Sequence, residues 1–310
     1  MYRWQERASI SALGSERGSP ALSRYIRCFA SVSLRFEFTD NAGGLAHLSA
    51  RVKTKAERWK ILLGDGALLL PRYLEATDGL SHEPKGIRRS ELFFFYALVA
   101  PLHPARIVES GRARAQSTLV LARLFPEASI VSLESDAASP DAKIAAERLR
   151  NCRNVECRFG DSLLLLPQLV QAGDVVLIDG PKDFRALKLA FRLLRSGKPR
   201  VVFVHDLWLG SPARPFVDRC LPSALLSDAP EWVQHYAPLD STRPVPGSAP
   251  NDPRRAYGAT LGRFEADAEN YLRRHFQCRV AQGSYRIGET ARKILRRPSI
   301  IRPKDFEERA

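Results

Sequence analysis

Acidic side chains follow apolar runs at several points of the chain, and in one place a histidine stands beside the acid. Asp179 ends the apolar run that starts at Asp174, and His205 and Asp206 end a second run that starts at Arg200. Histidine titrates near neutral pH and can act as a general base, whereas carboxylates can orient a substrate or bind a divalent ion. The pattern therefore predicts a site for proton transfer, with a metal ion as one option.

Lys182 follows Asp179 closely, within the segment GPKD. Its ammonium group can orient an anionic acceptor, but it can also be a surface lysine in the first turn of a helix. His205 has a comparable alternative, as a histidine that caps the edge of a sheet and makes its hydrogen bonds there. We take His205, Asp179 and Lys182 as the candidate catalytic residues.

A glycine turn and a further acid occur between Arg106 and Asp136. One apolar run stops at Glu109-Ser110-Gly111, and apolar residues at helical spacing follow after a few small or polar residues. This order predicts a strand, a tight turn, a helix and a second strand that ends at Glu134, 23 residues after Gly111. An acid at that place in a Rossmann-like sheet holds the pair of ribose hydroxyls.

The segment RIVESGRARAQSTL resembles the first motif of class I S-adenosylmethionine-dependent methyltransferases. The likeness is to the sugar and antibiotic O-methyltransferase group (methyltransferase family 24-like), with the pattern E-x-G-x-x-x-G-x-S-T. Ala115 stands where the second glycine of that pattern is usual, which narrows the room for close backbone approach to the ligand. The resemblance implies S-adenosylmethionine as the cofactor, bound by Glu109, Gly111, Ser117, Thr118, Glu134, Asp161 and Asp179.

The resemblance extends to the two acid-ended runs. In this group, acids after the fourth and fifth strands hold a divalent metal or orient the acceptor. Asp179 and Asp206 match those positions, but Pro181 replaces one expected acidic ligand and cannot coordinate through its side chain. A divalent ion would then be held mainly by water and substrate. We therefore expect weak metal binding at best, with His205 as the base.

The spacing of apolar residues predicts the elements that position these side chains. The runs ending at Asp179 and Asp206 are continuously apolar, which predicts parallel strands covered on both faces. We expect an α/β, Rossmann-like doubly wound sheet, mostly parallel, with an antiparallel edge strand and helices on both faces. Tyr257 to Glu265 is predicted to be the closing strand, and Trp232 to Leu239 another strand.

Four regions are predicted along the chain. Residues 1–52 form a poorly structured arm, and residues 53–104 form a helical lead-in or lid segment, with a turn at Gly64-Asp65-Gly66. Residues 105–265 form the S-adenosylmethionine-binding domain. Residues 266–310 form a basic extension with a helix from Glu289 to Arg297.

The net charge of +14 lies mostly in the two ends of the chain. Residues 1–60 carry 11 basic and 5 acidic residues, residues 254–310 carry 14 and 7, and the region between them is almost neutral. The basic ends can contact nucleic acid, lipid or a protein partner, although solvated charge is the commoner explanation. The longest apolar stretch, Leu92 to Leu102, is far short of the roughly 20 residues of a membrane-spanning helix. The five cysteines are scattered, which is typical of reduced thiols in a cytoplasmic protein.

Three functions follow from these observations. The first is O-methylation of a sugar or another small hydroxylated metabolite, with a small-molecule acceptor as the partner. The second is a methyltransferase-fold binding module that has lost catalysis, suggested by Ala115 and Pro181. The third is an RNA methyltransferase that uses the basic ends, which is disfavoured because no N-P-P-Y motif follows the fourth predicted strand.

Overall fold

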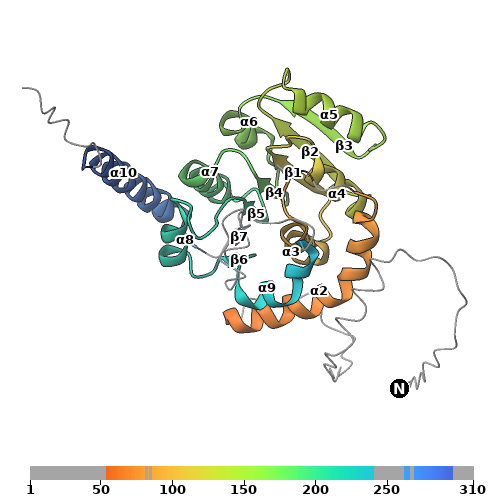
Figure 1. The fold of residues 1–310 in the computed structure, drawn as a ribbon, viewed down its shortest axis with the longest axis horizontal. Helices are drawn as coiled ribbons and strands as arrows, with labels where there is room; N and C mark the ends of the chain where they lie inside the picture. The colour runs from red at the N-terminus through yellow and green to blue at the C-terminus, as the bar shows by residue number, and fades with distance from the viewer. Residues whose placement is uncertain (1–53, 81–82, 84–85, 241–261, 266–268, 296–310) are drawn as a thin grey trace, which may run out of the picture. The chain divides into compact units, whose positions relative to one another are not determined.

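A single sheet organises the part of the chain that the computed structural model describes, which is residues 54–80, 83, 86–240, 262–265 and 269–295. Its strand order is β3-β2-β1-β4-β5-β7-β6 (Figure 1). The strands are β1 (Arg106–Ser110), β2 (Ser129–Glu134), β3 (Val155–Phe159), β4 (Val175–Ile178), β5 (Val201–Val204), β6 (Leu225–Leu226) and β7 (Gly262–Glu265). The arm expected over residues 1–52 lies outside the described residues.

The first five strands are parallel, and β7 runs antiparallel to β5. Ile107 of β1 lies beside Ile130 of β2 on one side and Val175 of β4 on the other. Strand β7 pairs Phe264 with Val202 and closes the edge together with β6. The predicted fold class, a mostly parallel doubly wound sheet with an antiparallel strand near its edge, is confirmed.

Helices cover both faces of the sheet (Figure 1). The helices are α2 (Lys55–Thr77), α3 (Arg89–Val99), α4 (Gln116–Leu124), α5 (Pro140–Leu149), α6 (Ser162–Leu169), α7 (Asp183–Arg195), α8 (Arg214–Cys220), α9 (Pro230–Tyr236) and α10 (Tyr271–Leu295). Short 3-10 turns follow α3 and α9, at Ala100–Leu102 and Ala237–Asp240. No helix of the described residues is both long enough and apolar enough to cross a membrane.

Each face has its own apolar core. On one face, Val176 and Val202 belong to a buried cluster that includes Phe191 of α7 and residues of α6, α8 and α10. On the other face, the ring of Phe95 in α3 lies 4.6 Å from that of Phe203 in β5. Burying strands on both faces removes apolar surface from water, which explains why their sequences are continuously apolar.

Helix α2 differs from the sequence expectation. A turn was expected at Gly64-Asp65-Gly66, but the helix runs without a break through these residues and through Pro71. A Cβ atom on Gly66 would lie 2.7 Å from the hydroxyl oxygen of Tyr236 in α9. This glycine therefore permits close packing of two helices, a role that sequence alone does not separate from a turn.

Two further elements correct the prediction. The segment predicted as a strand from Trp232 to Leu239 is helix α9 followed by a 3-10 turn, because Trp232, Val233 and Tyr236 bury one helical face. Trp232 packs against Phe93 of α3, with ring centroids 5.4 Å apart. The C-terminal helix is also longer than predicted, since α10 begins at Tyr271 rather than at Glu289.

Candidate active site

The glycine turn after β1 is held in a left-handed backbone conformation. Gly111 has φ +87°, and a Cβ atom placed there would lie 2.8 Å from the carbonyl carbon of Asp179. Ala113 and Ala115 also have positive φ values, 44° and 61°. Ala115 is fully buried at the N-terminal cap of α4, in a conformation that glycine adopts without strain. This explains the preference for glycine at that position of the motif.

Glu109, Ser117 and Thr118 form the buried base of the turn. The Glu109 carboxylate accepts hydrogen bonds from Thr118 Oγ1 at 2.5 Å and from Ser132 Oγ at 2.8 Å. Burial raises the pKa of Glu109, and the hydroxyls of Ser117, Thr118 and Ser132 oppose that rise. The contacts that the structure gives these residues are within the protein, and their role as cofactor ligands stays a prediction.

Glu134 and Asp161 lie at the carboxyl ends of β2 and β3, on the same edge of the sheet as the turn. Glu134 accepts hydrogen bonds from the backbone N–H groups of Ala113 and Ser135, both at 2.7 Å. Asp161 caps helix α6 and accepts from the N–H of Leu163 at 2.8 Å. Backbone donors thus fix both carboxylates at the edge where doubly wound folds bind their ligands.

The lead-in segment before α3 is fastened to the same turn. Glu83 pairs with Arg114 at 3.2 Å and also with Arg148. Its backbone N–H donates to the side chain of Gln116, which in turn donates to the carbonyl of Ile87 at 2.8 Å. The segment therefore contacts the residues of the turn, while its role as a lid stays a prediction.

A histidine between carboxylates forms the second part of the site. His205 follows β5 and is 6% exposed. Its Nδ1 lies 2.6 Å from the Asp179 carboxylate, and its Nε2 lies 3.2 Å from Oε2 of Glu91 in α3. Glu91 is fully buried and also accepts from the N–H of Arg88 at 3.1 Å. Both ring nitrogens therefore face acids.

Lys182 joins the same group at the start of α7. Its Nζ lies 2.7 Å from Oδ1 of Asp179 and also contacts the carboxylate of Asp206. Asp206 lies 3.5 Å from Nδ1 of His205. We call Glu91, Asp179, Lys182, His205 and Asp206 the charged cluster. The structure thus brings together all three candidate catalytic residues.

The charges in this cluster reinforce one another. Burial alone would lower the pKa of His205, but Asp179 and Glu91 outweigh it and raise that pKa well above its usual value. Burial likewise opposes ionisation of Asp179, but His205 and Lys182 bring its pKa below the ordinary range. The Lys182 pKa is raised, because Asp179 and Asp206 outweigh its own burial. The imidazolium of His205, the ammonium of Lys182 and the carboxylate of Asp179 are therefore favoured, whereas burial raises the pKa of Glu91.

The cluster contains the donors of a metal site, together with two cations. Asp179, His205 and Asp206 each bring one ligand atom within 4.8 Å of the others. However, the Lys182 ammonium contacts both carboxylates, and a protonated His205 has no lone pair to offer. These residues do not fit a tightly held divalent ion. The weak metal binding inferred from Pro181 stays a prediction.

Glu91 is the member that sequence reasoning missed as a site residue. In the sequence it stands three residues after Arg88 at the start of a helix, and its carboxylate does take part in that N-terminal cap. The same carboxylate also reaches His205, 114 positions further along the chain. The sequence did offer one signal, because Glu91 stands shortly before a run of aromatic residues that should be buried. An acid that is fully buried is rarely without a partner, so this position indicated a polar contact inside the protein.

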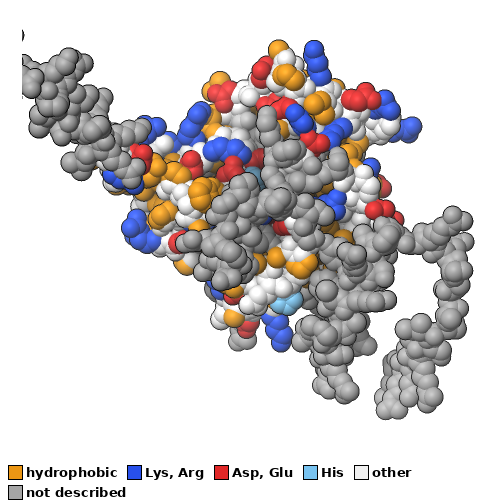
Figure 2. All heavy atoms as spheres, viewed as in Figure 1, with side chains coloured by type: hydrophobic (Ala, Val, Ile, Leu, Met, Phe, Trp, Pro, Cys, Tyr) orange, Lys and Arg blue, Asp and Glu red, His pale blue; other side chains and the backbone are white. Residues whose placement is uncertain are grey.

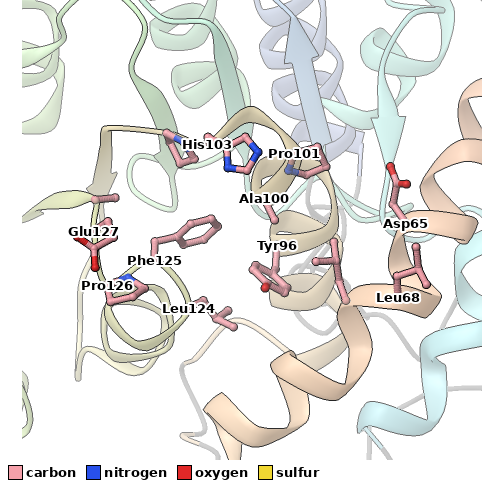
Figure 3. A pocket seen from close by; sticks show the side chains of 13 residues that line it. Asp65, Leu68, Tyr96, Ala100, Pro101, His103, Leu124, Phe125, Pro126 and Glu127 are labelled. Atoms are coloured by element: carbon pink, nitrogen blue, oxygen red, sulfur yellow. The ribbon is translucent and has the colours of Figure 1, made fainter. Parts of the chain in front are cut away.

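A pocket of about 550 Å³ lies elsewhere (Figure 3). Its lining includes Tyr96, His103 and Phe125, and it reaches Ala128 just before β2 begins. That is the amino end of the sheet, opposite to the edge that carries Glu134. We do not place the chemistry there, because ligands of doubly wound folds bind at the carboxyl ends of the strands.

Solved structures similar to this chain include three methyltransferases. The O-methyltransferase TomG from Streptomyces achromogenes, involved in tomaymycin synthesis and in complex with SAM, is 20% identical, covering 69% of this chain and 99% of its own, with a TM-score of 0.40. An O-methyltransferase from Bacillus cereus with SAH is 18% identical (65% and 90% covered, TM-score 0.37). The SAH-bound Podospora anserina methyltransferase PaMTH1 is 14% identical (70% and 98% covered, TM-score 0.37). No protein-family model and no curated protein matches the chain.

Because these sequence identities and TM-scores are low, we assign the fold from the order and pairing of the strands. Five parallel strands followed by the antiparallel strand β7 give the sheet that the sequence resemblance implied. The chain has a Rossmann-like, mostly parallel doubly wound fold. In this fold, the glycine turn and the charged cluster lie at the carboxyl ends of the adjacent strands β1 and β4.

Proposed function

We propose that the chain is an S-adenosylmethionine-dependent methyltransferase that acts on a hydroxyl group of a sugar or another small hydroxylated metabolite. One observation carries the proposal. A histidine flanked by carboxylates adjoins the glycine turn, through the contact of Gly111 with Asp179. A hydroxyl acceptor must lose a proton as it takes a methyl group, and this arrangement offers a base beside a nucleotide-type turn.

The residues at the turn fit the proposed cofactor. Gly111 has a positive φ and no side chain, which lets the turn pass against the backbone of Asp179, and Glu134 at the end of β2 would accept hydrogen bonds from ribose hydroxyls. Asp161 would bond the adenine ring, and Asp179 would hold the methionine part of the cofactor. When bound, S-adenosylmethionine supplies a methyl group that passes from sulfur to the acceptor oxygen and leaves a thioether.

His205 is the proposed base. The side chain of Asp179 is 11% exposed and that of Glu91 is fully buried, so the Nδ1 side of the ring is the side nearer the surface. In its neutral form, His205 keeps one proton on Nε2, where it donates to Glu91, and Nδ1 carries the free lone pair. Nδ1 takes the proton from the acceptor hydroxyl as the oxygen–carbon bond forms. Glu91 orients the ring through Nε2, and Asp179, beside Nδ1, stabilises the imidazolium that results.

Lys182 supplies a positive charge that a metal ion would otherwise provide. Its ammonium contacts both Asp179 and Asp206, and more than half of its side chain is exposed. It can therefore also reach an oxygen of the acceptor and orient it. Activity then needs no protein-bound divalent ion.

Calorimetric titration of the full-length chain with S-adenosylmethionine and S-adenosylhomocysteine tests the proposal first. Mass spectrometry of ligands that co-purify with the chain, followed by assays of S-adenosylhomocysteine release with sugars and other hydroxylated metabolites, identifies the acceptor. Absence of cofactor binding would contradict the proposal. Binding without turnover on the acceptor that co-purifies would favour the binding-module alternative.

A further inference from the structure

Helix α10 has one apolar face packed against the body of the molecule. Tyr271 and Cys278 on this face are 4% and 0% exposed. One further heptad along the helix, the ring of Tyr285 lies 6.1 Å from that of Phe184 in α7. This face holds α10 on α7, and the helix continues past α7 and α8 (Figure 1).

A second apolar face runs along the opposite side of the same helix. We call it the apolar stripe, and it consists of Leu272, Phe276, Val280 and Ile287. Their exposed fractions are 61%, 68%, 55% and 74%. With 3.6 residues per turn, their spacing places them on one line, about half a turn away from Tyr271 and Cys278. Large apolar side chains aligned along an exposed helix face are typical of a surface that binds a partner.

Positive charge borders the apolar stripe on both sides. Arg279 and Arg286 fall along one side and Arg273 along the other, and all three are exposed. Glu289 is the single acidic residue in the sequence of α10, and it pairs with Arg292 at 2.9 Å. The partner of this face must therefore offer both apolar contact and negative charge.

These requirements favour a lipid surface over a second copy of the chain. Pairing two copies stripe to stripe would place rows of arginines of like sign against each other. An anionic bilayer instead accepts apolar side chains at its acyl boundary and arginines at its phosphates. We propose that α10 docks the protein on an anionic lipid surface through the apolar stripe and Arg273, Arg279 and Arg286.

Vesicle flotation with the full-length chain tests this proposal. We expect binding to phosphatidylcholine vesicles that contain phosphatidylglycerol, and little binding to phosphatidylcholine alone. Salt should weaken the binding, because it screens exposed charges. The proposal does not depend on methyl transfer, so the test needs neither cofactor nor acceptor.

Two matched sets of variants locate the contact. Phe276→Ser with Ile287→Ser should weaken vesicle binding by about tenfold or more. Leu68→Ser with Leu164→Ser is the control, because these leucines are also exposed, at 78% and 64%, but lie on α2 and α6. The control should bind as the native chain does.

Charge is tested separately. Arg279→Gln and Arg286→Gln should each weaken binding to anionic vesicles by about fivefold. Circular dichroism melts establish that every variant is folded. Failure of the native chain to bind anionic vesicles, or unchanged binding by the Phe276 and Ile287 double variant, would overturn the proposal. A lipid-free dimer that this double variant converts to a monomer would assign the stripe to a second copy and would also overturn it.

Discussion

The carboxyl edge of the sheet has two halves that hold their acids in different ways. In the half formed by β1 to β3, Glu134 and Asp161 accept hydrogen bonds from backbone N–H groups. In the half formed by β4 and β5, Asp179 is paired with His205 and Lys182. Neutral donors fix a shape that changes little with pH, whereas paired charges depend on protonation. The first half is suited to holding a ligand and the second to moving a proton.

The described surface that Figure 2 shows is of mixed sign. Acidic and basic side chains are interspersed over the face shown in Figure 2. This agrees with the nearly balanced charge of residues 61–253, which carry 23 basic and 22 acidic residues. The difference between the two halves described here is one of local partners, backbone N–H groups in the first and charged side chains in the second.

Replacing His205 should give the largest effect. We expect His205→Ala to lower turnover by about 100-fold or more, because general-base catalysis contributes on that scale. Cofactor affinity should be retained, since Asp179 is the cofactor-binding candidate that contacts this ring and the other candidates belong to the β1 to β3 half. Parallel turnover assays and calorimetry check both statements. Turnover near the native rate would show that the base lies elsewhere.

Glu134→Ala should instead lower the affinity for the cofactor. Loss of a charge-assisted hydrogen bond to ribose costs about 1.5–3 kcal/mol, or roughly 10- to 150-fold in affinity for S-adenosylmethionine. Isothermal titration measures this directly. Glu156→Ala on the neighbouring strand β3 is the matched control, because its carboxylate pairs with Arg158 and is exposed. Equal affinity of Glu134→Ala and native chain would remove Glu134 from the cofactor site.

Much of the first half could be predicted from the sequence. The motif from Glu109 to Thr118 is local, and strand β2 follows after one helix, so the position of Glu134 can be counted along the chain. The second half depends on contacts between distant segments. Glu91 meets His205 only because α3 packs on the face of β5, which no local pattern indicates. The sequence therefore suggested His205 and Asp179 but not Glu91, the second acid that raises the pKa of His205.

The predictions that were wrong share this cause. Gly66 and Trp232 have strong local preferences for a turn and a strand, yet both lie in helices. Each packs against a segment far along the chain, Gly66 against Tyr236 and Trp232 against Phe93. Tertiary packing overrode local preference in both cases.

The pH dependence of activity should shift when Glu91 is changed. Asp179 and Glu91 favour the charged form of His205, so the neutral base appears only above the raised pKa. The acidic limb of kcat/KM should thus lie above about 6.5, the value for unperturbed histidine. In Glu91→Gln the acidic limb should move to lower pH. An unchanged pH profile of kcat/KM would show that Glu91 does not affect the pKa of the base.

The same raised pKa affects stability with a definite sign. The free energy of unfolding that the charged His205 contributes is fully present below its unfolded pKa and is lost as pH rises through the folded pKa. Denaturant unfolding of the native chain and of His205→Ala at several pH values checks this. The difference between the two proteins should shrink as pH increases.

Ala115→Gly should have a small effect. The backbone at Ala115 is already left-handed, so glycine removes strain while losing a buried methyl group. We expect affinity for S-adenosylmethionine at least as high as in the native chain, and a change of less than about 1 kcal/mol in the free energy of unfolding. A severe loss of affinity would mean that the motif has been aligned wrongly.

Chelation should have no effect on turnover. The Lys182 ammonium already contacts the carboxylates of both Asp179 and Asp206, so removal of divalent ions by a chelator should leave the native rate unchanged. Lys182→Gln is informative beside it, because the two acids are then free to take Mg²⁺. Added Mg²⁺ should raise the turnover of that variant only. Abolition of native turnover by chelator, or an octahedral ion between the two acids in a crystal, would contradict the metal-free mechanism.

The absence of a side chain at Gly111 determines which step of the reaction a substitution at this position would impair. The space a methyl group would need at this position is taken by the backbone of Asp179, 2.8 Å away, and Asp179 also donates its N–H to the carbonyl of Ser110. Any larger residue at position 111 must push the end of β4 outward and carry Asp179 away from His205. Gly111 thus allows the glycine turn and the end of β4 to lie in direct contact. A substitution at Gly111 in the glycine turn would therefore be measured as a defect in proton transfer, although Gly111 itself takes no part in that transfer.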